Sequence, residues 1–291
     1  MGKGEFFSLA SAIAWAFSVI LFKRSGATMP PFALNLFKNA FAVLLMAPTI
    51  MLLGGPIPDI GLQDLAILTG SGFIGIALAD TLYFKALNKI GASRTGIVSS
   101  IYSPSIIVLS YFILGERLGA LQWLGFTLVL AGVLLVSYRA AARDVHSDDL
   151  RRGAALAAVA VLLMAIGIVM VKHILEQQPF LWTVEIRLLG GMIGMLLVML
   201  IRGRTQVTID QFRAPHNWSQ ICVGSFLGAY VAIMFWMAGY KYTLASIASV
   251  LNETSSIFIM LLAWLMLREP LTRRKLLGLT CSFGGVVLML S

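Results

Sequence analysis

The chain has 291 residues, of which 59% are apolar and 12% charged, and its mean hydropathy is +0.89. Soluble domains carry about 25% charged residues, so this composition excludes an ordinary soluble protein and predicts an integral membrane protein. The net charge of +9 does not indicate a nucleic-acid partner, because the basic residues lie in short segments between apolar runs.

Ten apolar segments are long enough to cross a bilayer, since one spanning helix needs about 20 apolar residues. The connections between them are short, and even the two longest leave no room for a soluble domain. The predicted spans are residues 5–22, 31–53, 64–87, 93–114, 119–138, 153–171, 180–201, 217–240, 245–267 and 274–290.

The second half of the chain repeats the first. A shift of 149 residues places Lys38 on Arg187, and later in each half a shift of 153 residues places Glu116 on Glu269. Each half therefore holds five predicted spans. Because five is odd, the two halves enter the membrane from opposite faces, which is the arrangement that secondary transporters use for alternating access.

One pattern within the chain is a helix with a mid-span proline, a tight turn ending in Glu, and a glycine-bearing helix. Residues 86–133 carry it and resemble the fourth and fifth spans of the drug/metabolite transporter superfamily, in its EamA-type ten-helix branch. The matching residues are Pro104, Gly115, Glu116, Gly125 and Gly132 in the first half, and Glu269, Gly278 and Gly285 in the second, where Ile257 replaces the proline.

The resemblance implies an all-α integral membrane protein with ten transmembrane helices, arranged as two inverted five-helix repeats around a central cavity. The first EamA-like repeat is expected in residues 1–143 and the second in residues 144–291. Members of the family usually export small metabolites or amino acids. We expect no cofactor and no metal, a functional monomer, and a small-molecule substrate and the lipid bilayer as partners.

Basic residues are divided unequally between the two membrane faces. We name the face that holds both termini face A and the other face B. Fifteen lysines and arginines lie at face B and four at face A, namely Lys3, Arg117, Lys172 and Lys241. The positive-inside rule then places face B in the cytoplasm of a bacterial inner membrane and both termini outside. The family more often has cytoplasmic termini, so charge and resemblance favour opposite orientations.

Beyond the first two residues of each predicted span, six residues inside the spans carry a formal charge. An unpaired charge in hydrocarbon costs at least about 2.5–3.5 kcal/mol, so such residues pair, face a cavity or reach the interface. Two of them, Lys85 and Glu185, lie near span ends, where we expect them to reach water. The other four are Lys38, Asp80, Arg187 and Glu253.

Counting along the spans puts Lys38 and Asp80 at one depth near face B, and Arg187 and Glu253 at the mirrored depth near face A. We expect two cation–carboxylate pairs that line the cavity and act as gates toward the two faces. The alternative is that each pair is structural and fixes helix register. Asp80 has Ile233 at the equivalent position of the other repeat, which makes it the candidate for proton coupling.

Aromatic side chains inside the spans are further candidates for the cavity wall, although most such rings in a bundle serve packing. These residues are Trp15, Tyr83, Tyr102, Tyr230, Trp236 and Tyr240. Glycine-rich stretches at residues 70–80 and 188–197 favour close helix packing. We expect Glu116 and Glu269 to accept hydrogen bonds at the N-terminus of the helix that follows each of them.

The pattern as a whole predicts a secondary transporter that exports a small zwitterionic metabolite, an amino acid with an aromatic or other apolar side chain being the best match. An exporter of lipophilic cations is the alternative within this class. An intramembrane enzyme acting on lipid-linked substrates is the alternative from another class, but the sequence has no H-E-x-x-H, G-x-S-x-G or P-loop motif. Without a P-loop, a gradient would drive transport, with protons as a candidate coupling ion.

Overall fold

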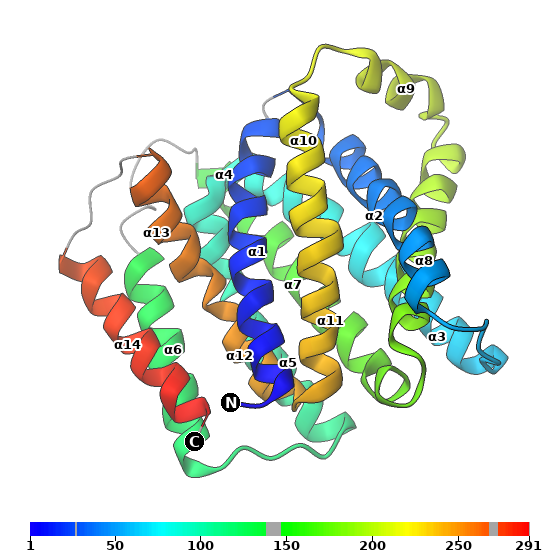
Figure 1. Ribbon diagram of the computed structural model, residues 1–291. Helices are drawn as coiled ribbons and strands as arrows, with labels where there is room; N and C mark the ends of the chain where they lie inside the picture. The colour runs from blue at the N-terminus through cyan, green and yellow to red at the C-terminus, as the bar shows by residue number, and fades with distance from the viewer. Residues whose placement is uncertain (27, 138–146, 268–272, 291) are drawn as a thin grey trace.

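The computed structural model describes residues 1–26, 28–137, 147–267 and 273–290. Regular secondary structure in these residues is helical, and the predicted all-α fold with ten spanning segments in two inverted sets of five is confirmed. Figure 1 shows both termini on the same side of the bundle, as an even number of spans requires.

The two repeats contain corresponding helices. The first repeat consists of α1 (Lys3–Ser25), α2 (Pro31–Leu53), α3 (Leu62–Gly72), η1 (Phe73–Asp80), α4 (Thr81–Ser99), α5 (Tyr102–Ile113) and α6 (Ala120–Ser137). The second consists of α7 (Ser147–Gln177), α8 (Phe180–Ile201), α9 (Thr205–Arg213), α10 (Trp218–Ser225), η3 (Phe226–Val231), α11 (Ala232–Tyr242), α12 (Ala245–Glu253), α13 (Ser255–Leu267) and α14 (Arg273–Met289). The expected boundary between residues 143 and 144, and Glu269, lie outside the described residues.

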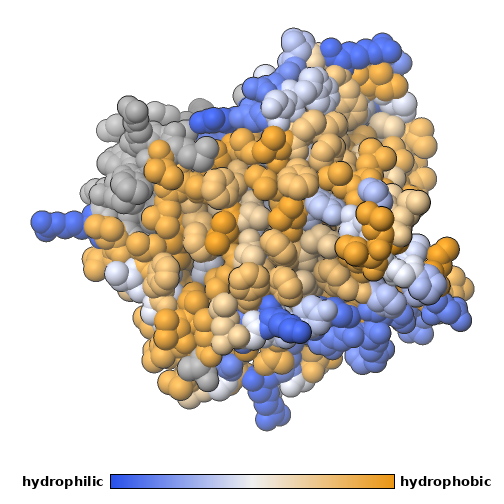
Figure 2. Space-filling view, in the orientation of Figure 1, coloured by the Kyte–Doolittle hydropathy of each residue, from blue (hydrophilic) through white to orange (hydrophobic). Residues whose placement is uncertain are grey.

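The surface is that of a membrane-embedded bundle. Within the described residues, six helical segments are long and apolar enough to span a bilayer, and α5, α6 and α14 are shorter apolar helices. Figure 2 shows a broad apolar band between two more hydrophilic ends. The chain is therefore a multi-pass membrane protein.

A π-helical segment interrupts the third span of each repeat. These segments, η1 and η3, begin at Phe73 and Phe226, which are equivalent at the shift of 153 residues. A π-helix displaces carbonyl groups from the regular α-helical ladder, and in a membrane they need other donors. In η1, the Asn35 amide donates to the Ile76 carbonyl over 2.9 Å, and the Thr81 hydroxyl donates to the Ala77 carbonyl over 2.7 Å. The sequence analysis did not predict these segments.

The prediction of a connection between two helices at residues 88–92 is wrong. Helix α4 continues to Ser99, and its C-terminal half packs along α7. Ile90 packs directly against Gly153, and the Lys89 ammonium pairs with the Asp149 carboxylate at 2.6 Å, so α7 supports the extra turns. The equivalent connection in the second repeat is present, because α11 ends at Tyr242 and α12 begins at Ala245.

The most extensive helix contacts join one repeat to the other. Helix α6 packs along α14, α4 along α7, α1 along α11, and α3 along α8. The α6–α14 contact rests on a pair of glycines, since a Cβ atom on Gly125 would lie 2.7 Å from the Gly285 carbonyl oxygen, and one on Gly285 2.6 Å from that of Gly125. The core of the bundle therefore lies between the repeats.

Glycines also bring α3 and α8 into backbone contact. A Cβ atom on Gly72 would lie 2.0 Å from the carbonyl oxygen of Arg187, and one on Gly191 would lie 3.2 Å from the carbonyl oxygen of Gly72. Small residues at such contacts are what membrane helices use for close approach. This contact fixes the position of the α8 turn that carries Arg187.

We predict that Gly72→Ala lowers the stability of the bundle, while Gly70→Ala does not. Both changes give the helix the same gain in propensity, but only the first forces a methyl group into the α8 backbone, and overpacking costs about 1–3 kcal/mol. A Cβ on Gly70 meets no atom within 4 Å. Thermal unfolding of the detergent-purified variants measures the difference. Equal midpoints for the two variants would show that α3 and α8 are not in tight contact.

Candidate functional site

An ion pair lies in the interior of the first repeat. Lys38 on α2 is 1% exposed, and its ammonium group bonds to Asp80 Oδ2 at the end of η1. The same ammonium lies 5.5 Å from the centre of the Phe84 ring. Direct pairing offsets much of the cost of burying both charges, whereas either one alone would be strongly destabilising. Lys38 and Asp80 therefore form an ion pair in this structure.

Arg187, the repeat equivalent of Lys38, has a different environment. It is 4% exposed, its Nε donates to Ser71 Oγ over 3.2 Å, and its Nη1 lies 3.6 Å from Met237 Sδ. The guanidinium carbon lies 5.1 Å from the centre of the Trp236 ring, within the range of a cation–π contact. A Cβ atom on Gly75 would lie 2.8 Å from Nη2, so a glycine leaves room for the guanidinium.

Glu253, the last residue of α12, bonds to the start of α5. Its Oε1 accepts hydrogen bonds from the Ser103 backbone N–H over 3.3 Å and from the Ser103 hydroxyl over 3.1 Å. The backbone N–H groups in the first turn of a helix lack intrahelical partners and favour an anion. Glu253 therefore provides the hydrogen-bond acceptor for a backbone N–H in the first turn of α5, a helix of the other repeat.

The predicted Arg187–Glu253 ion pair is absent from this structure. Both residues belong to the described part of the chain, and no ion pair joins them there. The physical reason is that Ser103 provides two donors to the carboxylate, while Ser71, Met237 and Trp236 hold the guanidinium. Counting along helices predicts the depth of a group but not the direction in which its side chain points.

Aromatic residues connect these charged groups. The hydroxyl groups of Tyr102 and Tyr240 are 2.8 Å apart, and the Tyr240 ring packs edge-on against Trp236 with 5.1 Å between ring centres. The Trp236 ring, which packs on the Arg187 guanidinium, belongs to the same apolar cluster as Tyr102 and Tyr240. We name Lys38, Asp80, Tyr83, Tyr102, Arg187, Trp236, Tyr240 and Glu253 the central cluster.

Two predicted aromatic candidates lie elsewhere. The Tyr230 hydroxyl is 2.6 Å from Thr49 Oγ1 on α2, and Trp15 packs against the apolar cluster that includes Phe22 and Phe84. The sequence analysis missed Ser71, Ser103 and Met237, because serine and methionine are ordinary packing residues in a membrane helix. Only Ser103 carried a signal, since it precedes a proline at the start of a helix.

The two charged residues near span ends differ. Lys85 is exposed, as expected. The expectation that Glu185 reaches water is wrong, because it is 7% exposed and its Oε2 has no hydrogen-bond partner among the described residues. Glu185 lies on the inward face of α8, two residues before Arg187, and packing of that face removes it from the interface.

Glu116 caps a helix, but not the one expected. Its carboxylate accepts hydrogen bonds from the backbone N–H groups of Ala245 and Ser246 over 2.7 and 2.9 Å, and from the Ser246 hydroxyl over 2.8 Å. These groups begin α12 of the second repeat, whereas the next helix in sequence is α6. Gly115, with φ of 69°, turns the chain in the left-handed region and directs Glu116 across the repeat boundary.

A lysine of α7 holds the other side of the same connection. Lys172 Nζ donates to the Thr243 carbonyl over 3.0 Å and pairs with Glu176. We name Glu116, Lys172 and the backbone of residues 243–246 the face A clamp. It ties α5, α7 and α12 together at the face that holds both termini.

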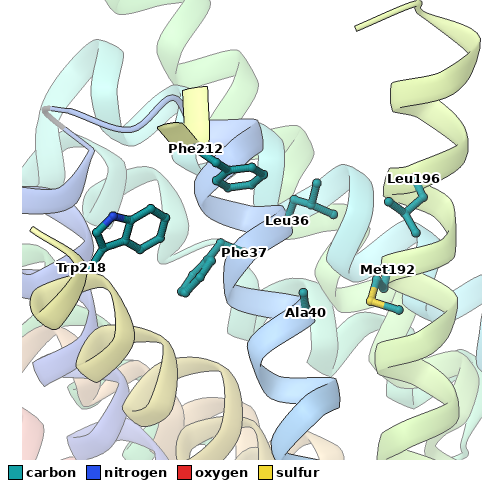
Figure 3. A pocket seen from close by; sticks show the side chains of 7 residues that line it. All are labelled: Leu36, Phe37, Ala40, Met192, Leu196, Phe212 and Trp218. Atoms are coloured by element: carbon teal, nitrogen blue, oxygen red, sulfur yellow. The ribbon is translucent and has the colours of Figure 1, made fainter. Parts of the chain in front are cut away.

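A separate groove lies on the flank of the bundle. Figure 3 shows it between α2 and α8, closed at one end by Phe212 of α9 and Trp218 of α10. Its volume is about 440 Å³, and its lining is apolar: Leu36, Phe37, Ala40, Met192, Leu196, Phe212 and Trp218. It contains none of the predicted site residues, so the polar chemistry of this chain lies in the central cluster.

The sequence matches a family of known proteins in two segments. Residues 2–138 and 151–291 each match the family model of the EamA-like transporter family. The chain belongs to this family. The two inverted repeats are therefore those of a transporter family.

Individual relatives are distant in sequence. The uncharacterized transporter YetK of Bacillus subtilis is 21% identical over 286 residues, which cover 97% of this chain and 86% of YetK. The UDP-N-acetylglucosamine transporter of Rattus norvegicus is 24% identical over 166 residues, covering 53% of this chain and 51% of that protein. A solved crystal structure with 18% identity superposes with a TM-score of 0.76 over 98% of this EamA-like chain and 94% of the other.

We predict that Glu116→Ala destabilises the protein by about 2 kcal/mol or more, since each hydrogen bond to a charged group contributes about 1.5–3 kcal/mol. Gln122→Ala is the matched control, because Gln122 accepts one bond, over 2.9 Å, from Gly119 N at the start of its own helix. Thermal unfolding in detergent compares them. If Glu116→Ala unfolds at the same temperature as Gln122→Ala, the face A clamp does not hold the two repeats together.

Proposed function

We propose that this EamA-like protein is a secondary transporter that exports a small zwitterionic metabolite, an amino acid with an aromatic or other apolar side chain being the best match. Transport proceeds by alternating access as the two inverted repeats move against each other. The observation that carries the proposal is that the two equivalent buried cations differ in one structure. Lys38 is paired with Asp80, while Arg187 and Glu253 are held apart.

Two gates that close alternately require one ion pair to be formed and the other to be broken in any one state. An ion pair that forms in only one of two states shifts their equilibrium by its differential energy. In this proposal the Lys38–Asp80 pair closes the path toward face B. Arg187 and Glu253 pair in the other state and close the path toward face A, and proton uptake at Asp80 is a route to coupling.

Among the alternatives, the central cluster disfavours a lipophilic-cation exporter, because a buried guanidinium repels such a substrate. A phosphorylated metabolite is the second candidate, since a relative matching half of the chain is named a UDP-N-acetylglucosamine transporter. That relatives are named transporters supports transport rather than catalysis. We place the protein in a bacterial inner membrane, acting as a monomer.

The orientation follows from charge, and we predict that face B is cytoplasmic. Figure 1 shows the connection between α2 and α3 and the connection between α8 and α9 at opposite ends of the bundle. Asp59 lies in the first connection and Arg204 in the second, and both are exposed. In a background without Cys222 and Cys281, a membrane-impermeant maleimide added to intact cells should label Asp59→Cys and not Arg204→Cys. Labelling of Arg204→Cys alone would reverse the orientation and place both termini in the cytoplasm.

The gate is tested by removing the ion pair. We predict that Lys38→Met, and the uncharged double variant Lys38→Met/Asp80→Leu, shift the population toward the state open to face B. A loss of about 1.4 kcal/mol changes the population ratio tenfold. Spin labels at Arg24 and Arg204, both exposed at face B, report the change as a longer distance.

Lys85→Met is the matched control, because it removes an exposed lysine of the same region. An unchanged distance distribution in the double variant would show that the Lys38–Asp80 pair fixes helix register and is not a gate.

A further inference from the structure

Arg187 has more hydrogen-bond donors than the protein uses. A guanidinium carries five N–H donors. In the part of the chain that the structure describes, Nε bonds to the Ser71 hydroxyl and Nη1 contacts the Met237 sulfur, which is a weak acceptor. No carboxylate there lies within ion-pair distance. The Arg187 side chain is 4% exposed, and among the described residues no carboxylate forms an ion pair with it.

The other repeat shows what such a cation normally contacts. Lys38 packs on Phe84, and Arg187 contacts Met237, which is equivalent to Phe84 at the shift of 153 residues. The two cations therefore occupy equivalent places. Lys38 has Asp80 as its partner, but the position equivalent to Asp80 is Ile233. The second repeat keeps the cation and lacks the anion.

The surroundings of Arg187 orient the guanidinium. Ser71 holds Nε, Trp236 lies 5.1 Å from the guanidinium carbon, and Gly75 provides the space for Nη2. An oriented guanidinium can bind a carboxylate or a phosphate through two parallel hydrogen bonds, which a lysine ammonium cannot do. The Tyr240 ring, whose hydroxyl is bonded to that of Tyr102, packs against the same Trp236 ring.

We infer that Arg187 is the anion anchor of the transported molecule: the carboxylate or phosphate group of the substrate bonds to Nη1 and Nη2 and supplies the charge that Ile233 does not. This inference deepens the proposed function, because it assigns a chemical group of the substrate to one residue. It applies equally to an amino acid and to a phosphorylated metabolite, and it requires every substrate to carry an anionic group.

A binding experiment on the full-length, detergent-purified protein tests the anchor without relying on transport. The probes are 3-phenylpropionate, which has a carboxylate, uridine monophosphate, which has a phosphate, and 3-phenylpropanamide, which matches the first probe without its charge. We expect one of the two anions to raise the unfolding temperature in a concentration-dependent way, and the amide not to. The anion that stabilises the protein identifies the source of the charge.

Variants connect the effect to Arg187. Arg187→Met should weaken binding of that anion at least about tenfold, since a charge-assisted hydrogen bond contributes about 1.5–3 kcal/mol. Arg187→Lys should retain part of the affinity. Gly75→Ala keeps the charge but displaces the guanidinium, and should also weaken binding, so the test does not depend on folding of Arg187→Met. Arg213→Met, at a side chain 75% exposed, should bind as the unchanged protein does.

The inference is overturned if neither anion stabilises the unchanged protein, or if stabilisation persists in both Arg187→Met and Gly75→Ala. Uptake of radiolabelled L-phenylalanine into proteoliposomes tests the proposed function separately. Anion binding at Arg187 without uptake would contradict the amino-acid proposal and leave the anchor in place, whereas uptake that is insensitive to both variants would do the reverse.

Discussion

The cost of holding a charge away from water governs the interior of this bundle. Hydrocarbon offers no solvent to a lysine or a glutamate, so each buried charge needs a partner supplied by another helix. Lys38 on α2 obtains Asp80 from η1, and Glu253 on α12 obtains Ser103 from α5. The π-helical η1 carries Asp80 at its end, and Asn35, one turn before Lys38, bonds to its backbone. Neighbouring residues thus supply both the partner of a buried charge and the donor for a carbonyl group of the π-helix.

The two repeats provide partners for their backbone groups and buried cations in different ways. At face A the helix ends between α11 and α12. Glu116 accepts hydrogen bonds from backbone N–H groups at the start of α12, and Lys172 donates to the Thr243 carbonyl in the connection. In the first repeat, the equivalent stretch remains helical within α4 and packs on α7. The buried cations differ likewise, one paired with a carboxylate and the other held by a hydroxyl, a thioether and an aromatic ring. Two repeats that are similar in sequence therefore differ in structure.

Sequence alone predicted most of the architecture and less of the site. Composition and the odd number of spans in each half gave ten helices in two inverted repeats, because these depend only on hydropathy and parity. Depth counting paired Lys38 with Asp80 correctly but failed for Arg187 and Glu253, since depth is one coordinate and the rotation of each helix about its axis is another. Glu116 was expected to act locally, and its partner lies 129 residues away in sequence. The π-helical segments left no recognisable pattern beyond the paired glycines Gly75 and Gly228.

The interleaving of the repeats has a consequence for how the molecule holds together. The broadest contacts, α6 with α14, α4 with α7, α1 with α11 and α3 with α8, all cross from one repeat to the other. Neither half has a complete interior of its own, so each would expose its polar and glycine-lined faces to lipid if it stood alone. The stability of each repeat therefore depends on its contacts with the other repeat, as in an obligate heterodimer, although both belong to one polypeptide. A destabilising substitution in either half therefore also lowers the stability of the other half. Cooperative folding follows from the interface rather than from either repeat.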